Sequence, residues 1–255
     1  MNSERKIFID VIILSYSKSD QLKELTKQSV STCLKSENAS FIEFNIIVIE
    51  SNRLLKPYQF DNTLTIYPDV NFGFHKYLNI GIRSSSNEFI CLCNNDLIFH
   101  KGWATSILNA MVSDPNLMSA SPYCPTFHGT RNIVKCNNVI YGYTNGIHLA
   151  GWCIFVKRKL FEQIGLLDER FVFWCCDDDY RMTLKKYNIP HALVCNSVVE
   201  HLESSSINNI DNKQLRSFRT KLYTTAQQHF FDFKWNHKSR LILYLKYLKL
   251  FILDK

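Results

Sequence analysis

The chain has 255 residues, of which 46% are hydrophobic and 21% are charged. This balance is ordinary for a globular protein and excludes disorder, collagen-like structure and coiled coil as descriptions of the whole chain. The 30 lysines and arginines exceed the 23 aspartates and glutamates, which gives a net charge of +7. Such mild basicity favours anionic partners such as nucleotide phosphates, but it is too weak to indicate nucleic acid, and we expect none.

The nine cysteines are an odd number, so they cannot all pair within the chain. Most lie in apolar stretches, where a free cysteine behaves as a small hydrophobic residue. Cys91 and Cys93 point the same way from one predicted strand, and without a matching Cys/His pair we interpret them as core thiols rather than zinc ligands. No signal peptide is evident before the first strand, so we expect a cytoplasmic, reducing environment.

The first half of the chain alternates between strand and helix patterns, which indicates an α/β sheet with covering helices. The run from Phe8 to Leu14 is almost continuously apolar, as in a strand buried on both faces. Ser19 or Asp20 caps a helix whose apolar face includes Leu22 and Val30. Further strands are predicted at 44–49, 64–67, 88–93 and 97–99, with helices at 74–83 and 103–112.

The second half of the chain has a less regular pattern. Glycine and asparagine residues between 116 and 150 predict short strands and loops. From residue 211 the pattern is helical and basic, so the simplest organisation is one domain, residues 1–205, with a C-terminal helical appendage, residues 206–255. Between these parts we predict a strand at 154–156, a helix at 157–164 closed by Gly165, a helix at 177–187, and strands at 192–194 and 198–199.

Three common motifs of nucleotide-binding and hydrolytic sites are absent from the sequence. No G-x-G-x-x-G follows the first strand, no G-x-x-x-x-G-K-[ST] occurs, and there is no G-x-S-x-G. A dinucleotide oxidoreductase and a P-loop nucleotidase are therefore disfavoured.

Asn94, Asn95 and Asp96 directly follow a predicted buried strand. In open α/β sheets ligands gather at the carboxyl ends of strands, and a carboxylate flanked by amides is a hard-oxygen site for Mg²⁺ or Mn²⁺. The alternative is a plain turn, which these residue types also favour. His201 follows another short strand and is either a structural residue or an imidazole ligand of such an ion.

Asp177, Asp178 and Asp179 form an acidic run at the start of a predicted helix. Acids there complement the helix dipole, yet one cap needs only one aspartate, and three repel each other unless a cation or a proton is nearby. Successive helical residues point about 100° apart, so the three cannot all face one ligand. We expect Asp179 to be an exposed first-turn acid whose loss affects mainly stability.

The order of these motifs resembles the inverting family 2 glycosyltransferases of the GT-A fold, a Rossmann-like mixed sheet flanked by helices, over residues 8–205. Residues 92–96 resemble that family's D-x-D motif, in the N-N-D form of rhamnosyltransferase-like members. Lys234-Trp235-Asn236 resembles a K-W-G found in some C-terminal extensions. Other matches are 11–16 with the opening strand, 47–52 with the second strand, 71–81 with the N-x-G-[FY] segment, and 151–169 with the acceptor side.

The resemblance implies a role for each matching residue. Asp177 is the implied catalytic base, from the family's E-D motif, and Asp96 with His201 is the implied site for Mn²⁺ or Mg²⁺. The implied nucleotide-sugar-binding residues are Ser15, Tyr16, Glu50, Asn52, Asn71, Gly73, Asn94 and Asn95. The implied acceptor-binding residues are Gly151, Trp152, Trp174 and Asp178, although either tryptophan could equally belong to the core.

Two positions depart from the family pattern. Cys176 stands where the E-D motif has a glutamate that would hold the acceptor or orient the base. Asn94 replaces the first acid of D-x-D, so the metal has one carboxylate fewer and depends more on His201 and on phosphate oxygens.

The residue types also suit sugar transfer on chemical grounds. A divalent ion would neutralise the leaving diphosphate, and Asp177 would remove the proton of an acceptor hydroxyl, so that in-line displacement inverts the anomeric centre. The resemblance implies a UDP- or dTDP-linked donor and a glycan or lipid-linked saccharide acceptor, in surface polysaccharide synthesis. One alternative is a degenerate sugar-nucleotide- or carbohydrate-binding module, which Cys176 and Asn94 suggest. The other is a nucleotidyltransferase. That class has a glycine-rich loop after the first strand, whereas residues 15–20 contain no glycine.

The tract from 241 to 253 is apolar with two lysines and is too short to span a bilayer. As an interfacial helix it would bring the protein to the inner face of an anionic membrane that carries a lipid-linked acceptor. The alternative is a helix packed on its own domain or in a dimer.

Overall fold

The computed structural model describes residues 6–202 and 218–253 of the chain. Within these residues nine strands form one mixed sheet, in the order β3-β2-β1-β4-β8-β6-β9-β5, with β7 paired to β9. The α/β class predicted from the sequence is therefore confirmed. The strands are β1 (Ile7–Ser15), β2 (Ile42–Glu50), β3 (Leu64–Ile66), β4 (Phe89–Asn94), β5 (Leu97–Phe99), β6 (Ser119–Tyr123), β7 (Val139–Tyr141), β8 (Cys153–Lys157) and β9 (His191–His201).

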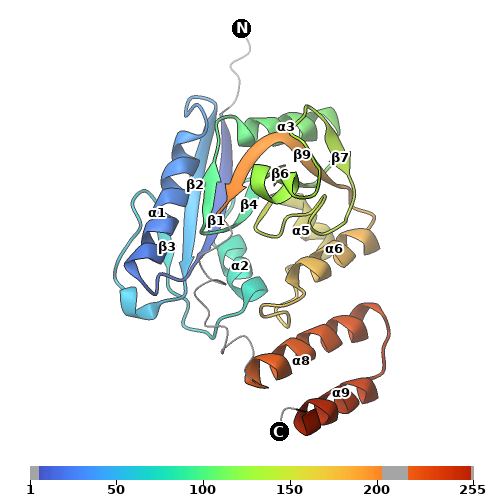
Figure 1. Ribbon diagram of the computed structural model, residues 1–255. Coiled ribbons are helices and arrows are strands. Elements are labelled where there is room, and N and C mark those ends of the chain that lie inside the picture. Colours follow the sequence, from blue (N-terminus) through green and yellow to red (C-terminus); the bar gives the residue numbers. More distant parts are fainter. Residues whose placement is uncertain (1–5, 203–217, 254–255) are drawn as a thin grey trace.

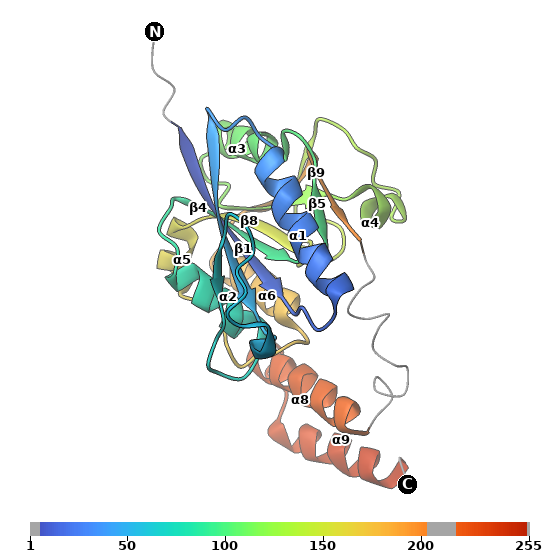
Figure 2. The same cartoon turned by 90° about the vertical axis from the view of Figure 1, so that its left-hand side faces the viewer.

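Helices cover both faces of the sheet (Figures 1 and 2), and the sheet separates the hydrophobic core into two layers. Side chains of β1 alternate between these layers, as expected for a strand buried on both faces. Ile9, Val11 and Ile13 pack under α1 (Asp20–Lys35) and α3 (Trp103–Ser113). Ile12 and Leu14 pack under α2 (Phe74–Arg83), α5 (Lys159–Ile164) and α6 (Cys176–Lys186).

Local signals account for where several helices begin and end. The Ser19 hydroxyl accepts a hydrogen bond from the Leu22 amide at 3.3 Å, so Ser19 is the predicted N-cap of α1. Gly165 follows α5 with a φ of 75°, the left-handed conformation that glycine supplies at a helix end. The short helices η1 (Arg53–Leu55) and α4 (Pro125–Gly129) were not predicted.

The last strand differs from its prediction. Two short strands were expected, but β9 is one strand of 11 residues. Asn196 is exposed between two apolar runs and suggests a break, whereas the structure accommodates it as an irregularity in the register between β6 and β9. The strand continues because β7 pairs with its first half and β5 with its last three residues, so His201 stands opposite Leu97.

Two C-terminal helices complete the described chain. In both views α8 (Phe218–Trp235) lies between the sheet domain and α9 (Arg240–Leu253) (Figures 1 and 2). Phe231 of α8 is buried against Phe171 and Cys176 of the domain. The predicted boundary at 205/206 lies outside the described residues, and no helix within the described ranges is long and apolar enough to cross a membrane.

Candidate active site

A network of buried hydrogen bonds joins the ends of β1 and β2. The Glu50 carboxylate accepts a bond from the Ser15 hydroxyl at 2.7 Å and from the amides of Ser17 and Asn52 at 3.0 and 2.7 Å. Glu50 is fully buried, so its carboxylate is committed to these protein donors. The neighbouring Tyr16 is 53% exposed. The pair Ser15 and Glu50 therefore fixes the loops that follow β1 and β2. Tyr16 and Asn52 in these loops lie nearer to solvent.

Helix α1 anchors the turn that contains Asn94, Asn95 and Asp96. The Asn95 side-chain amide donates to the Thr26 hydroxyl at 2.9 Å, and that hydroxyl also bonds Ser15 at 2.8 Å. The Ser29 hydroxyl bonds the Asn95 carbonyl at 2.8 Å. Sequence reasoning missed Thr26 and Ser29, although both lie at the spacing of the predicted apolar face of this helix and are polar there.

Asp96 and His201 come together because β5 pairs with β9. The imidazole Nε2 of His201 lies 3.3 Å from Oδ1 of Asp96, and both side chains are largely buried. The other ring nitrogen of His201, Nδ1, is buried without a hydrogen-bond partner among the described residues. One carboxylate and one imidazole suit Mn²⁺, and a buried imidazole nitrogen of this kind calls for a ligand, so the donor set fits a divalent ion.

Asp177 lies directly over Gly151. A Cβ added to Gly151 would overlap the Asp177 carboxylate, so glycine is the residue that makes room for this acid. Burial, with the nearby charge of Asp178 as a smaller cause, raises the pKa of Asp177 to about 6. A carboxylate with this pKa is largely ionised at neutral pH and close to the value at which proton transfer is most efficient.

The dipeptide Gly151-Trp152 joins the two halves of the site. Asp177 lies over Gly151. The ring of the next residue, Trp152, stacks on the imidazole of His201 with ring centroids 5.3 Å apart. The acid and the imidazole of the Asp96–His201 pair therefore contact adjacent residues of the chain. The Asn94 amide donates to the Trp152 carbonyl at 2.9 Å and fixes this stretch to β4.

The three adjacent acids are accommodated in three different ways. Asp178 accepts hydrogen bonds from Asn145 at 2.7 Å and Arg181 at 3.1 Å. Asp179 is only 2% exposed and bonds Lys234 and Trp235 of α8, so the expectation of an exposed first-turn acid is wrong. Within residues 6–202 and 218–253 no cation pairs with Asp177, and burial makes it bind its proton more tightly. A cation therefore offsets the charge of Asp178 and of Asp179, whereas the strain on Asp177 appears as a raised pKa.

The remaining predicted residues are dispersed around this centre. Asn71 is exposed, and Gly73 is the N-cap residue of α2. Trp152 is 6% exposed with one face on His201, so it belongs to the core, the alternative left open by the sequence. Trp174 is partly exposed and meets Phe173 edge-on at 5.3 Å. Cys176 is buried with its thiol towards the Phe171 carbonyl at 3.7 Å, so it does not substitute for an acceptor-binding glutamate.

The thiols of Cys91 and Cys93 are core residues, as interpreted from the sequence. Cys153 from the opposite strand β8 joins them, and the three sulfur atoms lie 3.3 to 3.9 Å apart within the layer under α1 and α3. Burial raises the pKa of the Cys91 and Cys153 thiols well above the usual value, which favours their neutral form.

Comparison with known proteins identifies the class to which this fold and site belong. A family model described as glycosyl transferase family 2 matches residues 10–188, more than two thirds of the chain. The protein belongs to glycosyl transferase family 2. No curated protein matches the chain.

Solved structures of glycosyltransferases share the fold. GalNAc-T7 with UDP, GalNAc and Mn²⁺ has a TM-score of 0.62 at 12% identity, covering 78% of this chain and 44% of its own. The mannosyltransferase PcManGT from Pyrobaculum calidifontis, in complex with GDP-Man and Mn²⁺, has a TM-score of 0.59 at 12% identity, covering 95% and 70%. TarS 1-349 of S. aureus has a TM-score of 0.54 at 12% identity, covering 87% and 65%.

These likenesses confirm the GT-A fold predicted from the sequence. The chain spans less than half the length of the GalNAc-T7 chain and about two thirds of the TarS chain. Two of the three neighbours were solved with Mn²⁺ and a nucleotide or nucleotide sugar.

Proposed function

We propose that the protein is a metal-dependent, inverting glycosyltransferase of the cytoplasm. It transfers a sugar from a UDP- or dTDP-linked donor to a hydroxyl of a glycan or a lipid-linked saccharide, in surface polysaccharide synthesis. The observation that carries this proposal is the Asp177 carboxylate, of raised pKa, held against Gly151 beside the stacked Trp152 and His201.

The donor half of the site lies at the carboxyl ends of β1, β2 and β4. Asp96 and His201 would hold Mn²⁺ or Mg²⁺, which supplies Lewis-acid neutralisation of the diphosphate charge. Tyr16 and Asn52 would contact the nucleoside, while Glu50 holds their loops through the amides of Ser17 and Asn52. Asn94 and Asn95, fixed by Trp152 and by α1, would offer polar groups to the donor ribose or sugar.

The acceptor half is centred on Asp177. Its role is to take the proton of the attacking hydroxyl, which makes a poor nucleophile competent at neutral pH. A pKa of about 6 is high for an aspartate, so the carboxylate is basic enough for this task and still ionised. Attack from the face opposite the leaving diphosphate then inverts the anomeric centre. Gly151 leaves the space that this carboxylate occupies.

The identity of the donor is open to direct test. The N-N-D form resembles rhamnosyltransferase-like members, which makes dTDP-rhamnose a candidate beside UDP-hexoses, and the PcManGT complex adds GDP-mannose to the set worth testing. A thermal-shift panel of UDP, dTDP and GDP sugars with Mn²⁺ would identify the nucleotide, because a ligand that binds only the folded state raises the melting temperature.

The experiment on the base compares two asparagine variants. Asp177→Asn keeps the size of the side chain but cannot take a proton, so transfer should fall by about 10²–10⁴-fold while donor affinity stays unchanged. Asp178→Asn is the comparison variant, because Asp178 is already paired with Asn145 and Arg181 and is not the proposed base, so transfer should fall far less than in Asp177→Asn. Full activity of Asp177→Asn would contradict the proposal. Donor binding without transfer by the wild type, across a broad acceptor panel, would favour the binding module.

We also propose that α9 rests on an anionic membrane surface. Leu241, Tyr244, Leu245 and Leu248 recur at helical spacing and are 58–68% exposed, while α8 covers another side of the helix. Arg240 and Lys249 lie on the same helix and are exposed, so an apolar strip with basic residues faces outward. Apolar burial combined with attraction to anionic lipid is the chemistry of interfacial helices. Such contact would place the site near a lipid-linked acceptor.

A further inference from the structure

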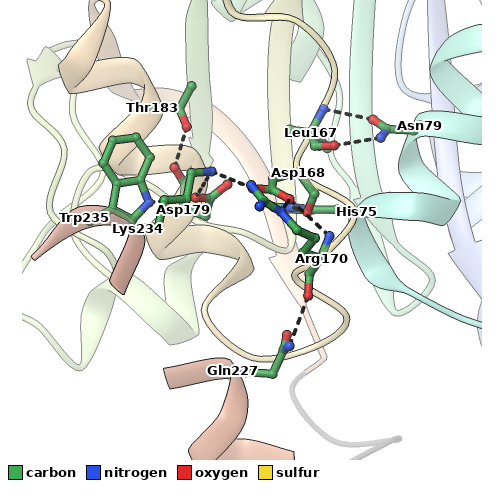
Figure 3. Close-up of polar contacts among 10 residues, drawn as sticks. All are labelled: His75, Asn79, Leu167, Asp168, Arg170, Asp179, Thr183, Gln227, Lys234 and Trp235. Carbon is green, nitrogen blue, oxygen red and sulfur yellow. Dashed lines mark hydrogen bonds and ion pairs between the residues drawn. The ribbon is translucent and has the colours of Figure 1, made fainter. Parts of the chain in front are cut away.

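Helix α8 forms hydrogen bonds to the first turn of α6, the helix that carries Asp177. The ammonium of Lys234 lies 2.6 Å from Oδ1 of Asp179, and the indole N–H of Trp235 donates to the same oxygen at 2.7 Å. Lys234 also bonds Oδ2 of Asp168 at 2.9 Å, so one cation joins two buried or partly buried acids (Figure 3). Asp177 and Asp179 share this first turn of α6, so whatever fixes one carboxylate constrains the other.

The start of α6 has little local support of its own. Its N-cap residue, Cys175, has a φ of 61°, a left-handed conformation that costs energy for any residue other than glycine. No side chain caps the first amides, and three carboxylates follow in succession. The strained entry and the mutual repulsion of the acids offset the favourable effect of the helix dipole, and only Asp178 has a cation within α6, so contacts from elsewhere in the chain help to hold this turn.

The same helix also holds the segment that leads to α6. Gln227 accepts a bond from the Val172 amide at 2.7 Å and donates to the Arg170 carbonyl at 3.1 Å. The Asp168 carboxylate bonds Lys234 and Arg170, and these cations hold its pKa well below the usual range. On the other side, the Asp168 carbonyl meets His75 of α2 at 3.0 Å (Figure 3). Residues 168–179 are therefore held between α2 and α8.

We propose that α8 belongs to the catalytic unit and that Lys234 is a positioning residue, which sets the placement of Asp177 by holding Asp179 and Asp168. Trp235 fixes the direction from which Asp179 is held, because an indole N–H is a single donor on a rigid ring. The inference rests on the proposed role of Asp177 as the base. It assigns the C-terminal helix a part in the reaction, although no residue of α8 needs to touch a substrate.

The central variants are Lys234→Met and Trp235→Phe, each compared with Lys238→Met. Lys238, in the connection between α8 and α9, is the matched control because it pairs with Asp232 of α8 at 3.0 Å and, among the described residues, forms no ion pair with α6. A shift of about 1 Å in a reacting group costs on the order of 10²-fold in rate, so kcat should fall by 10- to 100-fold in the first two variants. The KM for donor should not change, and Lys238→Met should keep the wild-type kcat. Lys234→Arg, which retains a cation with several donors, should recover most of the lost activity.

Loss of Lys234 removes a cation from two acids and could unfold the protein. A further variant therefore separates lost activity caused by unfolding from lost activity caused by misplacement of Asp177. Lys234→Met combined with Asp179→Asn removes both charges of one pair, which avoids an unpaired buried carboxylate. This double variant should fold and still show the low kcat with unchanged donor KM. A wild-type kcat in either Lys234→Met or the double variant, whatever the melting temperature, would overturn the inference.

Amide hydrogen exchange separates this inference from the proposed function. In Lys234→Met the amides of residues 175–179 should exchange faster than in Lys238→Met, because the turn loses its external support. Unchanged exchange there would overturn the positioning role even if transfer were lost. Faster exchange together with an active Asp177→Asn variant would show that α8 holds the first turn of α6, but it would refute the assignment of Asp177 as the base.

Discussion

Substitution of Gly151 by alanine tests the closest contact of the site. The new methyl group would occupy space now filled by the Asp177 carboxylate, and three atoms of that carboxylate would overlap it. The carboxylate would have to move by about 1 Å or more to restore ordinary contact, and a displacement of that size costs on the order of 10²-fold in rate. Overpacking of a dense site also costs about 1–3 kcal/mol, so a lower melting temperature is expected as well.

Gly129→Ala is the matched control for this substitution. A Cβ at Gly129 meets no heavy atom within 4 Å, and its backbone is not left-handed, so the same added methyl should be tolerated there. The assays are transfer rate, nucleotide affinity in the presence of Mn²⁺, and melting temperature. Gly151→Ala should lose transfer and keep nucleotide binding, because its methyl lies on the acceptor side. A transfer rate within roughly twofold of wild type would refute the placement of Asp177 over Gly151.

Three further predictions concern the pH dependence, the metal and the membrane. The kcat should rise with pH through about 6 as Asp177 ionises and then level off, and Asp177→Asn should abolish this dependence. Because the folded state holds this proton more tightly than the unfolded chain does, the unfolding free energy of the wild type in urea, minus that of Asp177→Asn, should fall as pH rises from the ordinary aspartate pKa of 3.8 to about 6. Asp96→Ala should abolish Mn²⁺-dependent nucleotide binding and His201→Ala should weaken it, whereas calorimetry showing full affinity for Asp96→Ala at limiting metal would refute the assignment. Leu245→Asp should reduce sedimentation with phosphatidylserine vesicles, while Val112→Asp, at a residue exposed on α3, should not, and equal partitioning of both would count against α9 as the contact.

Strands were predicted correctly from the sequence where their burial requires an apolar pattern. The run from Phe8 to Leu14 is buried on both faces, and almost continuous apolar character leaves few other conformations for it. The prediction failed at β9, because the exposed Asn196 looks like the end of a strand when the partners β5 and β7 are not known. Short elements such as α4 also have too few residues to show a period.

The candidate site was only partly predictable for a related reason. The sequence indicated Asn94–Asp96, His201 and the acidic run, because polar residues directly after apolar strands gather at one edge of a sheet. The partners of the acids could not be assigned, since Lys234 lies 55 residues beyond Asp179 and nothing local links the two. The contact of Asp177 with Gly151 is equally invisible, because a glycine leaves no side-chain pattern to read.

The distance along the chain between Asp179 and its partners has a consequence for biosynthesis. Ribosomes add about 5–20 residues per second, so α6 emerges seconds before Lys234 and Trp235 exist to hold it. The network of Ser15, Thr26, Glu50 and Asn95 lies wholly within the first hundred residues and needs nothing from α8. Under the proposed function, a nascent or truncated chain that lacks α8 would therefore bind a sugar nucleotide before it could activate an acceptor, and the order of translation would separate the two halves of the reaction.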